Sequence, residues 1–286
     1  MNEIGKVAVV GAGMMGAEIA YCFALAGKDV VLNDASMDLA CSGKHRLEKI
    51  LDKGISKGKI EPERKQSVLS LITPTDADHA LGDADLVVEA VFEDEQVKKE
   101  VMSRLDTICQ PHCIFATNTS SIPITRLATA VGPDRIGRFI GTHYFSPVSL
   151  MKLVEVVPGL ETTEETVATM MACCRDIGKT PIRVKDVPGF AVNRILHAMW
   201  IEVNRLVEEE VATIEDIDIG CKLGLGHPIG PYALMDLTTN TLNLQVQQIL
   251  FDAYGERFMP RPVLKQKVDA NHLGRKTGRG WYDYRK

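Results

Sequence analysis

A chain of 286 residues, 45% of them hydrophobic and 25% charged, has the composition of a folded globular protein, and its length suggests one large domain or two unequal ones. Its net charge of −5 gives no general attraction to polyanions, so neither nucleic acid nor an anionic membrane is an expected partner. The sequence shows no export signal and no membrane-spanning stretch, which favours a cytoplasmic protein. Seven cysteines, two of them adjacent, indicate reduced thiols rather than a secreted disulfide framework.

In chain order, short β-branched runs alternate with longer helical patterns, which predicts a parallel sheet wrapped by helices. The expected strands are Lys6–Val10, Val30–Asn33, Leu86–Glu89, Ile114–Thr117, Phe139–His143, Leu153–Val157 and Thr180–Val184. Helices are expected at Met14–Ala26 and Glu164–Ile177. The segment between Asp34 and Leu71 has no strand character, and it predicts a helical hairpin inserted between two strands with its turn near residues 58–62.

A domain boundary is predicted at Pro188, because Pro and Gly interrupt the chain there and strand patterns give way to helix patterns up to about Phe258. We therefore expect a cofactor-binding domain over residues 1–187 and a smaller all-α domain over residues 188–286. In the second domain, Val192–Val207 is apolar on most faces, which predicts a helix buried on more than one side. An interface between two copies of the chain would explain this pattern, so a homodimer is expected.

The strongest local signal is Gly11-Ala12-Gly13-Met14-Met15-Gly16, which directly follows the first expected strand and opens the next helix. In this context the glycines allow a tight turn, a close approach of the backbone to a pyrophosphate, and close packing of helix on strand. The pyrophosphate would lie on N–H groups at the helix N-terminus. The predicted fold class is therefore α/β, with a Rossmann-type doubly wound sheet that binds a dinucleotide.

Asp34 ends the second expected strand, roughly 20 residues after the glycine motif, where an acidic residue can accept hydrogen bonds from both ribose hydroxyls. That position favours NAD over NADP, because a 2′-phosphate would be repelled. Capping of the following helix is the alternative role for Asp34.

Two further loops follow expected strands of the same parallel sheet. Leu86–Glu93 is interpreted as the fourth strand with its loop, and Ile114–Thr117 delivers Asn118-Thr119-Ser120-Ser121 to the same carboxyl edge. Ligands bind at this edge in open α/β sheets. For either loop taken alone, capping of the next helix remains an alternative.

His143 lies at the end of an apolar strand, where a histidine alone is more often structural than catalytic. Glu155 changes that balance, because it lies inside the apolar strand Leu153–Val157, where an unpaired carboxylate would be costly. A His–Glu pair would satisfy the carboxylate and would also fix the imidazole tautomer for proton transfer.

A basic segment and a cysteine cluster each leave two interpretations open. Residues 44–65 hold eight Lys or Arg against four acids, a net charge of +4, and Lys49, Lys53 and Lys57 share one helix face. This face is either simply solvated or a contact for phosphates. Cys109, His112 and Cys113 lack a second Cys/His pair with zinc-ligand spacing, so buried thiols are expected there and no metal.

Several motifs occur together in the order and spacing of one family. They are GAGMMG, VVEAVFED, NTSS, THYFSP, LVEVV and PGFAVNRIL. Over essentially its whole length, up to Gly274-Arg275-Lys276-Thr277-Gly278, the chain resembles the short-chain L-3-hydroxyacyl-CoA dehydrogenases, which include bacterial 3-hydroxybutyryl-CoA dehydrogenases. The resemblance implies an NAD-dependent oxidoreductase that interconverts (S)-3-hydroxyacyl-CoA and 3-oxoacyl-CoA, with an acyl-CoA lying between the two domains.

The resemblance also implies roles for individual residues. It makes His143 the catalytic base, Glu155 its partner, and Ser120 and Asn193 the contacts of the substrate oxygen. On the cofactor side it implies Gly11–Gly16, Asp34, Glu93, Lys98, Asn118 and Lys276. It also places a basic coenzyme A contact close to Lys53.

One departure from the family pattern is Ser146, which stands where many relatives have an asparagine that helps to place the nicotinamide. The rival enzyme would be a dehydrogenase of a free hydroxy acid or sugar acid, and the basic helical insertion argues against it. A rival from another class is a catalytically silent NAD-binding sensor or lens-type structural protein. The joint presence of Ser120, His143, Glu155 and Asn193 argues against that interpretation.

Overall fold

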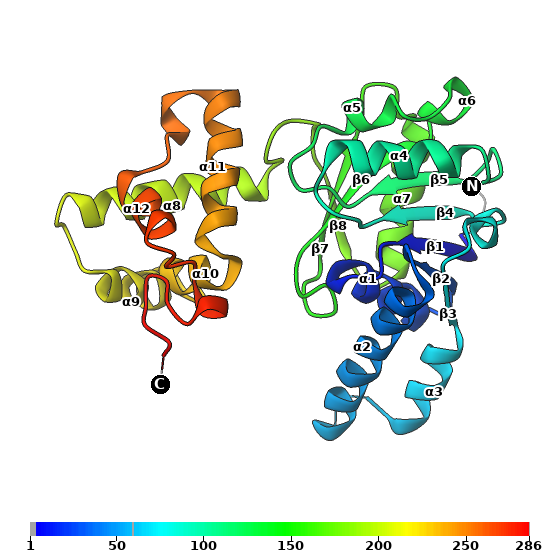
Figure 1. Cartoon of the computed structure of the whole chain (residues 1–286), viewed down its shortest axis with the longest axis horizontal. Coiled ribbons are helices and arrows are strands. Elements are labelled where there is room, and N and C mark those ends of the chain that lie inside the picture. The colour runs from blue at the N-terminus through cyan, green and yellow to red at the C-terminus, as the bar shows by residue number, and fades with distance from the viewer. Residues whose placement is uncertain (1–3, 59, 286) are drawn as a thin grey trace. The chain divides into compact units, whose positions relative to one another are not determined.

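The computed structural model describes residues 4–58 and 60–285. These divide into two compact units, with the division between Val187 and Pro188. The first unit is a sheet flanked by helices, and the second contains helices only (Figure 1). The α/β fold class and the all-α character of the C-terminal part are therefore as the sequence predicts.

The described part of the first unit forms one eight-stranded sheet in the order β3-β2-β1-β4-β5-β6-β7-β8. Its strands are β1 (Lys6–Val10), β2 (Asp29–Asn33), β3 (Ile72–Thr75), β4 (Leu86–Glu89), β5 (Ile114–Thr117), β6 (Phe139–Tyr144), β7 (Leu153–Pro158) and β8 (Thr180–Arg183). All neighbouring strands are parallel except β6 and β7, which are antiparallel. The chain reverses its direction of winding at β1, which pairs with both β2 and β4, and such a switch point is where doubly wound sheets bind ligands.

Helices cover both faces of this sheet, which explains why β4 and β5 are apolar runs buried along their whole length. The helices of the first unit are α1 (Met14–Leu25), α2 (Met37–Ser56), α3 (Pro62–Ser70), α4 (Glu95–Asp106), α5 (Ile124–Ala128), α6 (Pro133–Ile136) and α7 (Glu164–Asp176). Buried side chains of α1, α2 and α7 share one core with one face of the sheet. Helices α4 and α5 lie over the other face (Figure 1).

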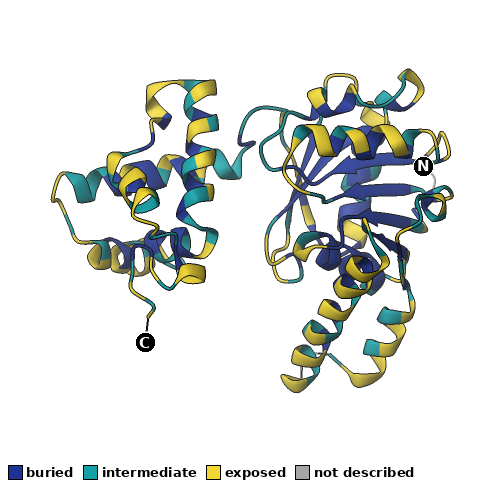
Figure 2. Ribbon diagram, viewed as in Figure 1, coloured by how far each residue is buried: buried dark blue, intermediate teal, exposed yellow. Residues whose placement is uncertain are grey.

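The predicted helical hairpin is confirmed as α2 and α3, and it extends away from the sheet (Figure 1). Ser36 caps α2, because its side chain accepts the N–H of Leu39, and Pro62 occupies the first turn of α3, where it costs no hydrogen bond. Only one stripe of α2 is buried, so most of the hairpin surface faces solvent (Figure 2).

The second unit packs α8 (Val192–Glu208), α9 (Ile214–Gly224), α10 (Pro231–Thr238), α11 (Asn240–Tyr254) and α12 (Pro262–Asp269) around one main core. Trp200, Tyr232 and Trp281 are its largest members, and the rings of Tyr232 and Trp281 lie 4.7 Å apart. Along α8, His197 and Trp200 are buried, whereas Ile195 is 72% exposed. Among the described helices none is both long and apolar enough to cross a membrane.

Candidate active site

The glycine-rich turn between β1 and α1 has two glycines that packing requires and one that faces open space. Gly11 has a φ of +96°, and a Cβ there would lie 2.7 Å from the carbonyl oxygen of Ala90. A Cβ at Gly16 would lie 1.8 Å from the carbonyl oxygen of Gly11. At Gly13, by contrast, a Cβ would meet no described atom within 4 Å, and no side chain caps α1. The open approach and the uncapped N–H groups fit the pyrophosphate of a dinucleotide.

Asp34 is attached to this turn rather than to the start of α2. Its Oδ2 accepts the N–H of Ala12 at 2.7 Å, and its Oδ1 accepts the N–H of Ala35 at the same distance. The cap of α2 is Ser36, so the alternative role of Asp34 as that helix's N-cap is not realised. Each carboxylate oxygen has a second lone pair, and the half-buried Asp34 can therefore still accept hydrogen bonds from ribose hydroxyls.

His143 and Glu155 are directly opposite each other on the antiparallel strands β6 and β7. Opposed residues project from the same face of a sheet, and here Nδ1 of His143 lies 2.8 Å from Oε2 of Glu155. Glu155 is fully buried and His143 is 5% exposed, so the contact offsets the cost of a charge held away from water. Because Nδ1 contacts the carboxylate, Nε2 is the nitrogen through which the imidazole can exchange a proton with a substrate.

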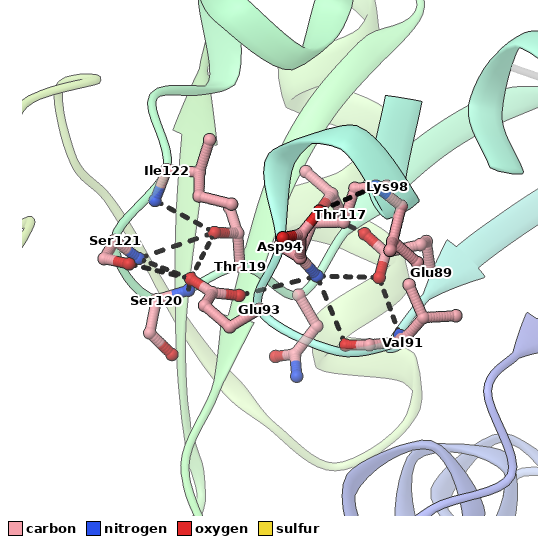
Figure 3. Close-up of polar contacts among 12 residues, drawn as sticks. Glu89, Val91, Glu93, Asp94, Lys98, Thr117, Thr119, Ser120, Ser121 and Ile122 are labelled. Carbon is pink, nitrogen blue, oxygen red and sulfur yellow. Dashed lines mark hydrogen bonds and ion pairs between the residues drawn. The ribbon is translucent and has the colours of Figure 1, made fainter. Parts of the chain in front are cut away.

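Glu93 organises the loop that follows β5 (Figure 3). Its Oε1 accepts the hydroxyl of Thr119 at 2.6 Å, the N–H of Ser120 at 2.8 Å and the N–H of Ser121 at 2.9 Å. Burial alone would raise the pKa of Glu93, but the Lys98 ammonium and the donors from Thr119, Ser120 and Ser121 outweigh burial and lower it. The carboxylate therefore holds the loop that carries Ser120 in one conformation.

Lys98 forms a buried ion pair with Glu89 and also lies near Glu93 (Figure 3). Its ammonium donates to Oε1 of Glu89 at 2.7 Å and lies 3.5 Å from Oε2 of Glu93, and the side chains of Lys98 and Glu89 are 1% and 0% exposed. Glu89 also accepts the hydroxyl of Thr117 and the N–H of Val91. Lys98 thus connects the end of β4 to the loop after it.

Asn118 and Ser120 complete the edge formed by β4, β5 and β6. Oδ1 of Asn118 accepts the N–H of Tyr144 at 2.9 Å, which ties the loop after β5 to β6 next to His143. Ser120 is half-buried, and its hydroxyl makes no hydrogen bond with any residue that the structure describes. This hydroxyl is consequently available to a substrate oxygen.

The remaining predicted site residues belong to the region of α2 or to the second unit. Lys49 and Lys53 are exposed on α2, and Lys57 is exposed at the C-cap of that helix. Within the described chain none of these three ammonium groups has an ion pair. Asn193, which is half-buried in the first turn of α8, and Lys276, which is exposed, belong to the second unit. Residue 59, one of the eight basic positions of the segment 44–65, lies outside the described residues.

Glu89 is not among the residues predicted from sequence, although the signal that marks Glu155 is present here too: an acid at the end of an otherwise apolar strand. Thr119 is predicted only as part of a loop, and not as a donor to Glu93. At the cysteine cluster, Cys109 and Cys113 are buried, and over residues 4–58 and 60–285 no group of three His, Cys, Asp or Glu could hold a metal ion.

A doubly wound sheet with a glycine-rich turn at its switch point, and a His–Glu pair at the same edge, is typical of a dinucleotide-dependent dehydrogenase. The family model described as "3-hydroxyacyl-CoA dehydrogenase, NAD binding domain" matches residues 6–187, and the model described as "3-hydroxyacyl-CoA dehydrogenase, C-terminal domain" matches residues 189–284. The chain therefore belongs to the 3-hydroxyacyl-CoA dehydrogenase family. It is an oxidoreductase, and its cofactor is NAD.

Known relatives cover nearly the whole chain. The 3-hydroxybutyryl-CoA dehydrogenase of Clostridioides difficile is 41% identical over 283 residues, which is 98% of this chain and 100% of that protein. The mitochondrial hydroxyacyl-coenzyme A dehydrogenase of Sus scrofa is 40% identical over 99% of this chain and 92% of its own length. The crystal structure of (S)-3-hydroxybutyryl-CoA dehydrogenase from Ralstonia eutropha superimposes with a TM-score of 0.95 at 40% identity, covering 99% of this chain and 100% of that one.

Proposed function

We propose that the chain interconverts an (S)-3-hydroxyacyl-CoA of short acyl length, such as 3-hydroxybutyryl-CoA, and the matching 3-oxoacyl-CoA, such as acetoacetyl-CoA. The observation that carries this proposal is the buried His143–Glu155 pair, held at 2.8 Å on the edge of the sheet where the glycine turn also lies. Relatives named for 3-hydroxybutyryl-CoA support the short acyl group.

In the proposed mechanism, His143 removes the proton of the substrate's 3-hydroxyl group during oxidation and returns it during reduction. Glu155 orients the imidazole and stabilises the imidazolium that forms. The hydroxyl of Ser120 donates a hydrogen bond to the oxygen at carbon 3, which gains negative charge during reduction. Asp34 and the glycine turn would hold the ribose and pyrophosphate of NAD(H), which would supply the hydride acceptor for carbon 3 in oxidation and the hydride donor in reduction. Asn193 stays a predicted second contact of the substrate oxygen.

The test is to follow absorbance at 340 nm with NADH and acetoacetyl-CoA, and then with NADH and free acetoacetate. Oxidation of NADH with the thioester alone is the expected result. Turnover of the free acid with equal efficiency would favour a dehydrogenase of free hydroxy acids. NADH binding without turnover of either compound would indicate a catalytically silent NAD-binding protein.

Three further assignments belong to the same proposal. The exposed Lys49, Lys53 and Lys57 contact the phosphates of coenzyme A, and this is supported by their lack of ion-pair partners among the described residues.

Two copies of the chain associate through the second unit. This is supported by exposed apolar side chains there, such as Ile195 and Leu223, which are 72% and 84% exposed. The location is cytoplasmic, supported by seven cysteines that are all unpaired. Light scattering of the purified protein tests the dimer.

A further inference from the structure

The second unit begins with a strained turn that is pressed against α11. Gly189 has a φ of +74°, and a Cβ there would lie 2.6 Å from Cδ2 of Leu250 on α11. Phe190, which follows it, is buried and has a φ of +45°, a left-handed conformation that costs energy for a residue other than glycine. Such a conformation persists only where the surrounding contacts fix it, and α8 begins two residues later at Val192.

One side chain, Tyr254 at the end of α11, holds both ends of this segment. Its hydroxyl donates to the carbonyl oxygen of Pro188 at 3.0 Å. The guanidinium carbon of Arg194 lies 4.1 Å from the centre of the Tyr254 ring, and that of Arg257 lies 5.0 Å from it. A cation over an aromatic ring is attracted by the ring's negative face, so Tyr254 contacts Arg194 through its ring and Pro188 through its hydroxyl.

Asn193 lies between these two anchored points. It is half-buried, and its side-chain amide makes no hydrogen bond with any residue in the described ranges. No hydrogen bond of the Asn193 side chain therefore fixes the direction of its amide. That direction depends on the backbone of residues 188–194.

We propose that Tyr254 is a positioning residue, which fixes the segment 188–194 and thereby the direction in which Asn193 presents its amide to the substrate oxygen. This inference rests on the proposed role of Asn193 in thioester reduction. It assigns to Tyr254 no contact with substrate or cofactor.

The experiment compares Tyr254→Phe, which loses only the hydroxyl, with Tyr254→Leu, which also loses the ring. Tyr282→Phe is the matched control, because its hydroxyl bonds Oδ2 of Asp218 at 2.9 Å in the same unit, outside the segment 188–194. Amide hydrogen exchange of residues 189–194 should become several-fold faster in Tyr254→Phe and faster still in Tyr254→Leu, and it should stay unchanged in the control. An unchanged exchange rate in both Tyr254 variants overturns the proposal that Tyr254 fixes the segment 188–194, whatever the enzyme's substrate is.

The kinetic arm tests the link to Asn193. With acetoacetyl-CoA, Tyr254→Phe should lower kcat several-fold with a smaller change in KM, and NADH affinity should remain within twofold, because its proposed turn is in the first unit. In an Asn193→Ala background the same substitution should have almost no further effect, since the amide that it misplaces is gone. Losses that multiply fully in the double variant would overturn the positioning role, and a native enzyme inactive on the thioester would instead contradict the proposed function.

Discussion

The imidazole of His143 is the group that we expect to transfer the substrate proton, and His143→Gln tests this directly. Glutamine preserves much of the side-chain volume and a hydrogen-bonding group but cannot act as a base. Turnover of acetoacetyl-CoA should fall about 10²–10⁴-fold, the range for losing a positioned acid–base group. The affinity for NADH, measured by fluorescence titration, should change little. Turnover close to the native rate would exclude His143 as the catalytic base.

Glu155→Gln tests the partner of this histidine. The substitution keeps the volume of a side chain with no exposed surface, yet it removes the charge that stabilises the imidazolium. We expect kcat to fall while binding of the thioester persists, measured from full saturation curves beside a thermal melt. If the variant loses activity only because it unfolds, Glu155 is structural.

The role of a residue could be predicted from sequence where its own strand explains it. It could not be predicted where it depends on the geometry of a loop. Glu155 could be paired with His143, because a carboxylate inside an apolar strand needs a partner and β6 and β7 supply one. A cofactor contact of Glu93 stays a prediction, whereas the hydrogen bonds that its Oε1 accepts from Thr119, Ser120 and Ser121 could not be predicted from sequence. The path of the loop after β5 decides which backbone N–H groups lie near the carboxylate oxygen of Glu93. The residue pattern of the loop alone does not predict that path.

At the scale of elements, the loops after β4 and β5 are joined through Glu93, and this junction should depend on pH. Glu93 has a lowered pKa in the folded chain, so its ionised form stabilises the loop above the ordinary glutamate value of about 4.5, and this stabilisation is lost as pH falls through the folded value. Thr119→Val removes one donor that lowers the pKa. The folded pKa should therefore rise, and the acid-side loss of kcat/KM should begin at higher pH than in the native enzyme.

The pH profile of kcat/KM, recorded from neutral pH downward, gives the measurement. Thr129→Val is the matched control, because among the described residues its hydroxyl donates only to the carbonyl oxygen of Arg126 on α5. An acid limb at the same pH in the native enzyme and both variants would contradict a role for Glu93 in ordering the Ser120 loop.

The sheet could be predicted almost strand by strand, because strands covered on both faces appear as short apolar runs. The predicted Lys6–Val10, Leu86–Glu89 and Ile114–Thr117 have the observed bounds, and the other predicted strands differ by one residue at one end. No range was predicted for β3, since its four residues include Pro74 and only two of them are buried. The order of the strands in the sheet could not be predicted in detail, because it depends on which strands pair in three dimensions rather than on any one segment.

At the scale of the whole molecule, charge is distributed unevenly. The chain carries −5 overall, yet residues 44–65 carry +4. Part of this positive charge is used within the hairpin and its surroundings: Lys44 donates to the carbonyl oxygen of Ile72, and Lys65 pairs with Asp52 at 2.6 Å. Lys49, Lys53 and Lys57 remain exposed, so a polyanionic ligand would meet a local cationic face on an acidic protein.

Coenzyme A carries a 3′-phosphate and a diphosphate, which the acidic chain would repel without such a face, so Lys53→Glu distinguishes a CoA enzyme from a free-acid enzyme. At a partly exposed site each phosphate contact should contribute on the order of 1 kcal/mol and weaken with salt. The KM for acetoacetyl-CoA should rise several-fold, with a smaller rise for a pantetheine thioester that lacks the nucleotide. Arg138→Glu, at the exposed residue immediately before β6, makes the same change in net charge and should leave both KM values unaltered. Equal increases for the two thioesters would show that α2 does not contact the nucleotide, and its lysines would then be a solvated helix face.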